Sequence, residues 1–122
     1  MENLALWYRR FGEPESVLQP ETAPPGALAP GHLRVQMLYA PVNASDLIPI
    51  TGAYRHRTPL PAVAGYEGVG VVIQAPASFA HLQGKRVLPL RGQGTWQRYA
   101  DCPAEYAIPV PDDVDSRLAA RA

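Results

Sequence analysis

The chain has 122 residues, a length that suits one domain, and 47% of them are hydrophobic, which is enough for a core. Eleven basic and eleven acidic side chains balance, so nothing indicates nucleic acid or an anionic membrane as a partner. The one cysteine, Cys102, excludes an internal disulfide and a multi-cysteine zinc site. Neither a secretion signal nor the roughly 20 apolar residues of a membrane span are found, so we expect a cytoplasmic protein.

Turn-forming residues are spread along the whole chain. Fourteen prolines and ten glycines separate short apolar runs, a pattern that indicates many short strands joined by turns and no long helices. We therefore predict a mainly β domain. The expected strands cover residues 4–8, 16–21, 32–39, 66–74, 85–90, 95–102 and 105–110.

The clearest strand is 32–39. Leu33, Val35, Met37 and Tyr39 alternate with polar residues, so they are predicted to share one face. The sheet pairing is expected to stop just after this strand, where a proline follows.

A short polar turn follows this strand. Asn43, Ser45 and Asp46 are residues that bond to nearby backbone amides and begin helices. A single helical turn is expected directly after them, ending at Pro49 or Gly52.

Glycines alternate within the expected strand 66–74. Gly68 and Gly70 lie on one face, where a glycine lets another backbone or a ligand come close. We favour close packing of a curled sheet over ligand approach as the cause.

The last residues contain the beginning of a helix. Asp115 or Ser116 can cap it, but fewer than two turns follow, and isolated helices this short are marginal. We therefore expect the chain to be part of a longer protein.

Several short motifs occur in a recognisable order and spacing. They are Phe11–Pro14, Ala40–Asp46, Thr51–Tyr54, Gly65–Gly70, Gly94–Trp96 and Ile108–Pro111. With them the chain resembles the N-terminal, GroES-like catalytic domain of the medium-chain dehydrogenase/reductase superfamily. The resemblance implies a GroES-like curled partial β-barrel with short helical turns over residues 1–122. It also implies a second, Rossmann-type domain that would hold the coenzyme, since no glycine fingerprint for a dinucleotide is present here.

Within that superfamily the chain is most similar to the zinc-independent 2-enoyl thioester reductases and quinone oxidoreductases. Zinc alcohol dehydrogenases have a cysteine at the position of Asn43 and a histidine at that of Tyr66, and neither residue present is a normal zinc ligand. We therefore expect no zinc. Tyr66 is also a departure from the thioester reductases, which usually have asparagine there.

The resemblance gives Tyr54 the role of the catalytic acid. Reduction of an enoyl thioester builds negative charge on the thioester oxygen, and a tyrosine hydroxyl, with an ordinary pKa near 10, is neutral at pH 7 and can donate a hydrogen bond to it. The alternative is a loop tyrosine that packs on the sheet.

Other polar and aromatic residues near this segment have two interpretations each. Asn43 either orients substrate or the coenzyme amide, or only caps the turn. Asp46 and Glu67 are expected to make internal bonds. Trp96 is a candidate wall of the substrate cleft, although an aromatic residue in a strand is more often part of the core.

Cationic side chains follow Tyr54 directly. We hypothesise that Arg55, His56 and Arg57 meet phosphate on a coenzyme A or carrier-protein substrate. A solvated loop is the alternative.

The resemblance thus implies the substrate-side domain of a zinc-independent, NADPH-dependent reductase of activated double bonds. Enoyl thioesters are the first expected substrate class and quinones the second, and the full-length protein is expected to form a homodimer through its other domain. The alternative is a stand-alone GroES-like module that binds a partner without catalysis.

Overall fold

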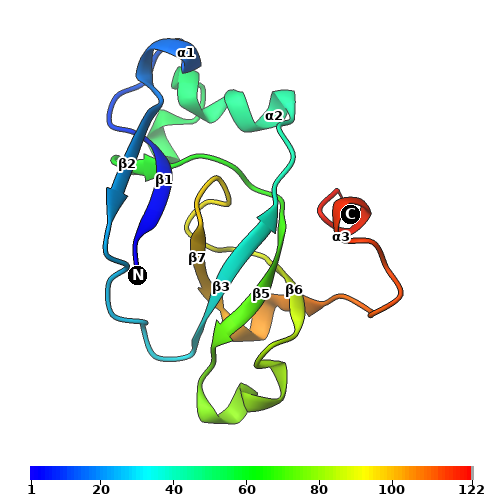
Figure 1. Ribbon diagram of the computed structural model, residues 1–122. Coiled ribbons are helices and arrows are strands. Elements are labelled where there is room, and N and C mark those ends of the chain that lie inside the picture. Colours follow the sequence, from blue (N-terminus) through cyan, green and yellow to red (C-terminus); the bar gives the residue numbers. More distant parts are fainter. Residues whose placement is uncertain (122) are drawn as a thin grey trace.

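The computed structural model describes residues 1–121 and is built mainly from short strands (Figure 1). The strands are β1 (Asn3–Tyr8), β2 (Gln19–Ala23), β3 (His32–Tyr39), β4 (Ala62–Val63), β5 (Val69–Gln74), β6 (Arg86–Pro89), β7 (Tyr99–Pro103) and β8 (Ala107–Pro109). The α-helices are α1 (Pro14–Val17), α2 (Ala44–Leu47) and α3 (Ser116–Ala119). The 3₁₀ helices are η1 (Pro49–Thr51), η2 (Arg55–Arg57), η3 (Ala77–Leu82) and η4 (Ala104–Tyr106).

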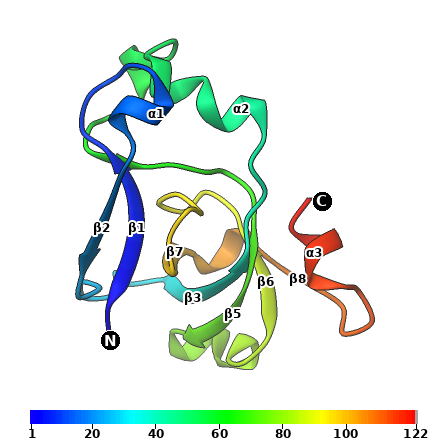
Figure 2. The same cartoon turned by 45° about the horizontal axis from the view of Figure 1, so that its top comes forward.

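The strands form two antiparallel sheets. A three-stranded sheet has the order β2-β1-β4, and a five-stranded sheet has the order β7-β3-β5-β6-β8. Figure 2 shows β1 and β2 beside the strands of the larger sheet, with α1 and α2 over one end, and α3 lies next to β5 and β6. Because none of the strand pairs is parallel, the fold needs no long helical crossovers.

Backbone bonds join the two sheets. The Leu6 N–H donates to the Trp96 carbonyl at 3.0 Å, and the Arg98 N–H donates to the Leu4 carbonyl at 2.8 Å. These bonds place the segment that leads into β7 along β1, so the sheets curl toward each other without closing. The predicted GroES-like partial barrel with short helical turns is confirmed.

Three hydrophobic clusters fill the fold. The largest lies within the five-stranded sheet, and its buried residues are Leu33, Val35, Val72, Leu82, Val87, Cys102 and Ala104. A second cluster, of Tyr8, Val17, Ile50 and Ala64, joins β1 to the helical segment that follows β3. In the third, Ala119 at the end of α3 and the next residue, Ala120, pack against Val69 and Val110.

The predicted strand 32–39 is confirmed residue for residue. Leu33 and Val35 are fully buried as expected, but Tyr39 is 48% exposed, because the strand runs past the edge of the core. The residue expected to face away, Arg34, is also buried, and an ion pair with Asp101 makes this burial tolerable.

The predicted strand 4–8 is confirmed as part of β1, but most of the others begin too early. Residues 16–18, 66–68, 95–98 and 105–106 lie outside the strands, so these boundaries are wrong. Pro14 occupies the first turn of α1, and Val17 is buried in the second cluster, so a helical turn replaces the expected start of a strand. The helical turn after Asn43 and the helix capped by Asp115 are confirmed.

Gly70 marks a close approach between two strands. A Cβ atom at this position would collide with the Val35 side chain and would lie 2.5 Å from the Gln36 carbonyl oxygen. The predicted close packing is therefore the reason for a glycine here.

Among residues 1–121, no helix is long and apolar enough to cross a membrane.

Candidate functional site

The candidate site is built on the segment between β3 and β5. Asn43 and Asp46 form a capping box at the start of α2, in which the Asn43 N–H donates to Asp46 Oδ2 at 2.7 Å. The other carboxylate oxygen, Asp46 Oδ1, accepts from the Tyr66 N–H at 3.2 Å. The buried Asp46 carboxylate thus joins the start of α2 to the chain just before β5, and its expected internal bonding is confirmed.

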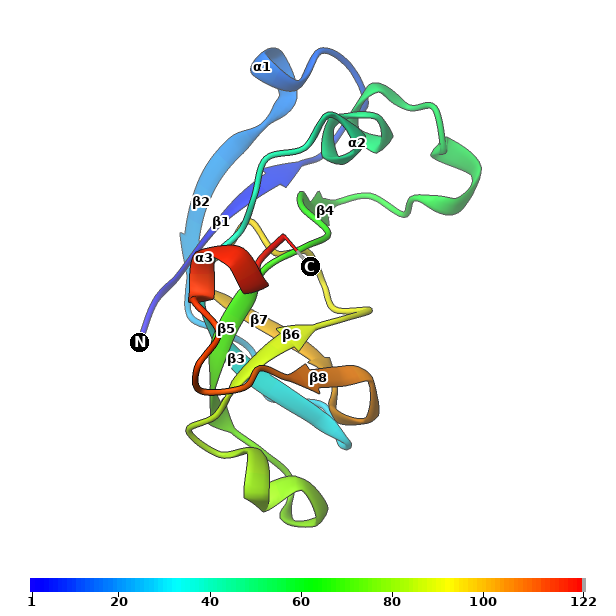
Figure 3. The ribbon, with the colours of Figure 1, turned by 90° about the vertical axis from the view of Figure 1, so that its right-hand side faces the viewer.

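A left-handed turn then brings Tyr54 into position. Gly52 has φ 97° and ends η1, a conformation that glycine adopts without strain. The Tyr54 carbonyl accepts from the Arg57 N–H at 3.0 Å and from Thr58 Oγ1 at 2.8 Å. In Figure 3 this segment, with η2, extends away from the sheets beside α2.

Tyr54 lies on a cavity of about 470 Å³ and is half-buried. We call this cavity the tyrosine pocket. Its lining residues are Ser45, Ile48, Tyr54, Arg57, Thr58 and Tyr66. The pocket is within the size range of small-molecule sites.

The two arginines of η2 point in different directions. The guanidinium carbon of Arg57 lies 4.5 Å from the centre of the Tyr54 ring, over its face. Arg55 instead donates from Nε to the Gly52 carbonyl at 3.1 Å and lies over the Phe11 ring. Of the cationic trio, only Arg57 lines the tyrosine pocket; Arg55 and His56 do not.

Tyr66 is a second phenol in the tyrosine pocket. It is not among the site residues predicted from the sequence. Partial burial and the negative charge of Asp46 raise the pKa of Tyr66, while Arg57 acts in the opposite direction. The signal was available: position 66 is where the zinc enzymes of the resembled superfamily have histidine, which marks it as facing a site.

Asn43 and Trp96 lie outside the tyrosine pocket. Asn43 Nδ2 donates to Glu67 Oε2 at 3.0 Å. Glu67 thus makes an internal bond, as expected. Trp96 donates from Nε1 to the Pro41 carbonyl at 3.2 Å and packs against the second hydrophobic cluster. It lines an apolar groove of about 730 Å³ instead.

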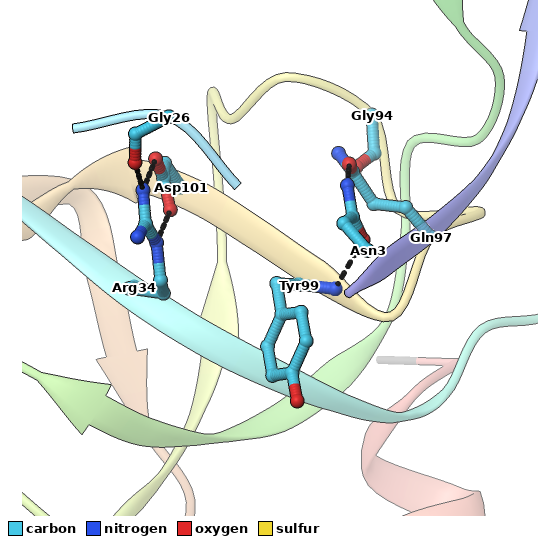
Figure 4. Close-up of polar contacts among 7 residues, drawn as sticks. All are labelled: Asn3, Gly26, Arg34, Gly94, Gln97, Tyr99 and Asp101. Carbon is cyan, nitrogen blue, oxygen red and sulfur yellow. Dashed lines mark hydrogen bonds and ion pairs between the residues drawn. The ribbon is translucent and has the colours of Figure 1, made fainter. Parts of the chain in front are cut away.

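A larger cavity adjoins the tyrosine pocket. We call it the polar cleft; its volume is about 700 Å³, and it shares Arg57, Thr58 and Tyr66 with the tyrosine pocket. Its walls come from the segments 23–26, 57–66 and 92–97 and from the strands β1, β3 and β7. Figure 4 shows the polar contacts along one wall.

The described residues do not fit a metal ion or a dinucleotide. Within residues 1–121, no cluster of three or more His, Cys, Asp or Glu side chains could hold a metal ion. For a dinucleotide, the fit also fails in this part of the chain: both sheets are antiparallel, and no helix there exceeds six residues, so there is no βαβ unit.

Comparison with known proteins agrees with this geometry. Residues 29–112 match the model of the alcohol dehydrogenase GroES-like domain. The mitochondrial enoyl-acyl-carrier-protein reductase of Rattus norvegicus is 40% identical over 118 residues, which is 95% of this chain and 32% of that protein. The corresponding Arabidopsis thaliana reductase is 36% identical over 120 residues, or 87% of this chain and 32% of that protein.

Solved structures show the same likeness. A candidate NADPH:quinone reductase from Bacillus thuringiensis has a TM-score of 0.95 and 48% identity, covering 99% of this chain and 37% of that one. The mitochondrial 2-enoyl thioester reductase Etr1p/Etr2p heterodimer from Candida tropicalis has a TM-score of 0.81 and 26% identity, covering 98% and 40%.

The chain spans about a third of the length of the curated relatives that it matches. The matched family model covers more than half of the chain, and its fold is the one found here. The chain therefore belongs to the alcohol dehydrogenase GroES-like domain family.

Proposed function

We propose that this chain is the substrate-side domain of a zinc-independent, NADPH-dependent reductase of activated double bonds, and that enoyl thioesters are its substrates. The observation that carries the proposal is the tyrosine pocket. There the half-buried Tyr54 stands beside Tyr66 and under the guanidinium of Arg57.

The chemistry requires an electrophile for a carbonyl oxygen. When the double bond is reduced, negative charge builds on the thioester oxygen, and a hydrogen-bond donor fixed in place stabilises it. The Tyr54 hydroxyl is such a donor. Arg57 supports it in two ways, because its guanidinium holds the ring and places a positive charge beside the pocket.

Metal-free chemistry is supported by the residues at the two positions that zinc alcohol dehydrogenases use. Asn43 gives its amide to Glu67, and Tyr66 presents a phenol, so neither offers the thiolate or imidazole that zinc prefers. A neutral phenol then takes the electrophilic role of the metal.

The coenzyme would supply the hydride, which adds to the β-carbon, and a proton from solvent at the α-carbon would complete the reduction. Since residues 1–121 contain no dinucleotide fold, we propose that a Rossmann-type domain of the full-length protein holds NADPH. The structure of Etr1p with NADP and crotonyl-CoA supports both the coenzyme and the thioester class, at 26% identity to this chain. A homodimer formed through that second domain and a cytoplasmic location are parts of the same proposal, although the relatives named above are mitochondrial.

Quinone reduction is the second candidate. It is favoured by the 48% identity to the Bacillus thuringiensis protein and by Tyr66, which replaces the asparagine usual in thioester reductases. A quinone oxygen also gains negative charge on reduction, so Tyr54 would serve it in the same way.

Steady-state oxidation of NADPH by the full-length protein distinguishes these candidates. We expect crotonyl-CoA to be reduced with a kcat/KM at least about tenfold above that of 1,4-benzoquinone, a difference of about 1.4 kcal/mol in the transition state. The reverse order would favour the quinone reductase. No oxidation with either substrate would favour a module that only binds a partner.

A further inference from the structure

The tyrosine pocket and the polar cleft adjoin each other. Both are lined by Arg57, Thr58 and Tyr66, so these residues form a junction between a cavity of about 470 Å³ and one of about 700 Å³. A ligand with its reacting group at Tyr54 can therefore extend past the junction into the polar cleft. The reacting group at Tyr54 would fill only the tyrosine pocket, the smaller of the two cavities.

One wall of the polar cleft is held by side-chain bonds between distant parts of the chain (Figure 4). Asn3 donates to Gln97 Oε1 at 2.8 Å and accepts from the Tyr99 N–H at 2.9 Å. Gln97 donates in turn to the Gly94 carbonyl at 2.8 Å. A wall fixed in this way is preorganised, so a ligand would not have to order it on binding.

The acidic groups of the cleft are already occupied. Asp101 accepts from Nε and Nη2 of Arg34, both at 2.9 Å, and Arg34 also donates to the Gly26 carbonyl. Glu21 accepts two bonds from Arg9. The carboxylates that would repel an oxygen-rich ligand are therefore neutralised by their own partners.

Hydrogen-bond donors remain free on this wall. Asn3 and Gln97 each use one amide N–H in the bonds above, and each has a second. Within residues 1–121, Arg57 forms no ion pair, unlike Arg9 and Arg34. Free amide N–H groups and an unpaired cation at the junction are complementary to oxygen acceptors.

We propose that the polar cleft is a second ligand subsite, which receives an arm bearing carbonyl or phosphate oxygens that is attached to the reacting acyl group. The proposal rests on the proposed function for the identity of the reacting group. It replaces the hypothesis that Arg55 and Arg57 act together, because Arg55 lines neither cavity. Arg57 lies directly over the Tyr54 ring. The ligand oxygen that Arg57 binds would therefore be one close to the reacting carbonyl.

A covalent plug tests this subsite. Gln93 is exposed and lines the polar cleft but not the tyrosine pocket, so Gln93→Cys labelled with N-ethylmaleimide places bulk in the cleft alone. Ser78 is exposed on η3 and lines none of the three cavities, so Ser78→Cys is the matched control. The parent protein, treated identically, corrects for other thiols; Cys102 itself is fully buried.

The readout is the KM of crotonyl thioesters with arms of increasing length: N-acetylcysteamine, pantetheine and coenzyme A. In labelled Gln93→Cys full-length protein, we expect the KM for crotonyl-CoA to rise at least about tenfold relative to that of the N-acetylcysteamine thioester. A similar rise with pantetheine assigns the cleft to the carbonyl-bearing arm, and a rise with coenzyme A alone assigns it to the phosphates. Labelled Ser78→Cys should leave the ratio unchanged. An unchanged ratio in labelled Gln93→Cys overturns the proposal.

A binding measurement separates this inference from the proposed function. If the unlabelled protein reduces none of the thioesters, the proposed function fails. The cleft is then tested by the rate at which maleimide modifies Gln93→Cys in the presence of acetyl-CoA, which has no double bond to reduce. Protection of the thiol in Gln93→Cys but not of that in Ser78→Cys supports the subsite, and equal rates with and without acetyl-CoA overturn it.

Discussion

The guanidinium carbon of Arg57 lies 4.5 Å from the centre of the Tyr54 ring, and both residues line one pocket. Arginine over an aromatic face contributes about 0.5–1 kcal/mol at exposed sites and about 2 kcal/mol where water is excluded. The two side chains come from the same short turn, so the contact fixes the phenol locally. The same guanidinium faces the polar cleft.

Removing the Arg57 charge should impair the site. In the full-length protein we expect Arg57→Gln to lower kcat/KM for crotonyl-CoA by about tenfold, since Tyr54 loses its stacked cation and the substrate loses a charged donor. Arg55→Gln is the control, because its guanidinium bonds to the Gly52 carbonyl away from both cavities. Equal losses in the two variants, measured by NADPH oxidation, would contradict a specific role for Arg57.

Asp46 should matter for stability. Asp46→Ala leaves the N–H groups of Asn43 and Tyr66 without their acceptor, so we expect a loss of about 2 kcal/mol in the free energy of unfolding. Denaturant titration of the variant measures it, and Asp113→Ala, at an exposed turn, is the control. A change no larger than that of the control would show that water replaces the carboxylate without cost.

The Arg34–Asp101 pair should behave as a buried pair. The side chains are 7% and 15% exposed, so Asp101→Ala leaves a guanidinium largely buried without its partner, at an expected cost of about 3–5 kcal/mol. Glu21→Ala, which breaks the exposed pair with Arg9, should have a much smaller effect. The double variant Arg34→Met/Asp101→Leu should be less destabilised than Asp101→Ala. If it were not, the cost would come from packing rather than from the unpaired charge.

Burial raises the pKa of the Cys102 thiol to about 11. The unfolded chain therefore loses this proton at a lower pH than the folded chain, so the contribution is complete below pH about 9 and is lost as pH rises toward 11. Burial also raises the pKa of Tyr8, which adds a loss of the same sign at a higher pH. We expect the wild-type free energy of unfolding to fall more steeply than that of Cys102→Ala between pH 9 and 11. Parallel curves from denaturant titrations would contradict this.

Local patterns were enough to predict much of the fold. The alternation of Leu33 and Val35 with polar residues predicted β3, because one face of that strand is buried. The helical turn after Asn43 followed from residues that cap helices through local bonds. Strand starts were predicted less well, since pairing partners far along the chain decide where the ladder begins, as at residues 66–68.

The candidate site was predicted only in part. Tyr54 and Arg57 are close in sequence, but the stacking of one on the other depends on the left-handed turn at Gly52 and on η2. Tyr66 reaches the same pocket through the bond of its N–H to Asp46, a contact between segments that no local pattern encodes. The polar cleft likewise needs Asn3 and Gln97 to meet, which only the joined sheets bring about.

The most direct test of the account is the turnover of Tyr54→Phe in the full-length protein with crotonyl-CoA and NADPH. Tyr106→Phe is the matched control, because Arg91 lies 4.2 Å from the centre of that ring, outside the tyrosine pocket and the polar cleft. We expect kcat to fall by about two to three orders of magnitude in Tyr54→Phe, as for the loss of one oxyanion donor, and to be unchanged in the control. A kcat for Tyr54→Phe within a factor of about three of wild type would contradict the role of its hydroxyl.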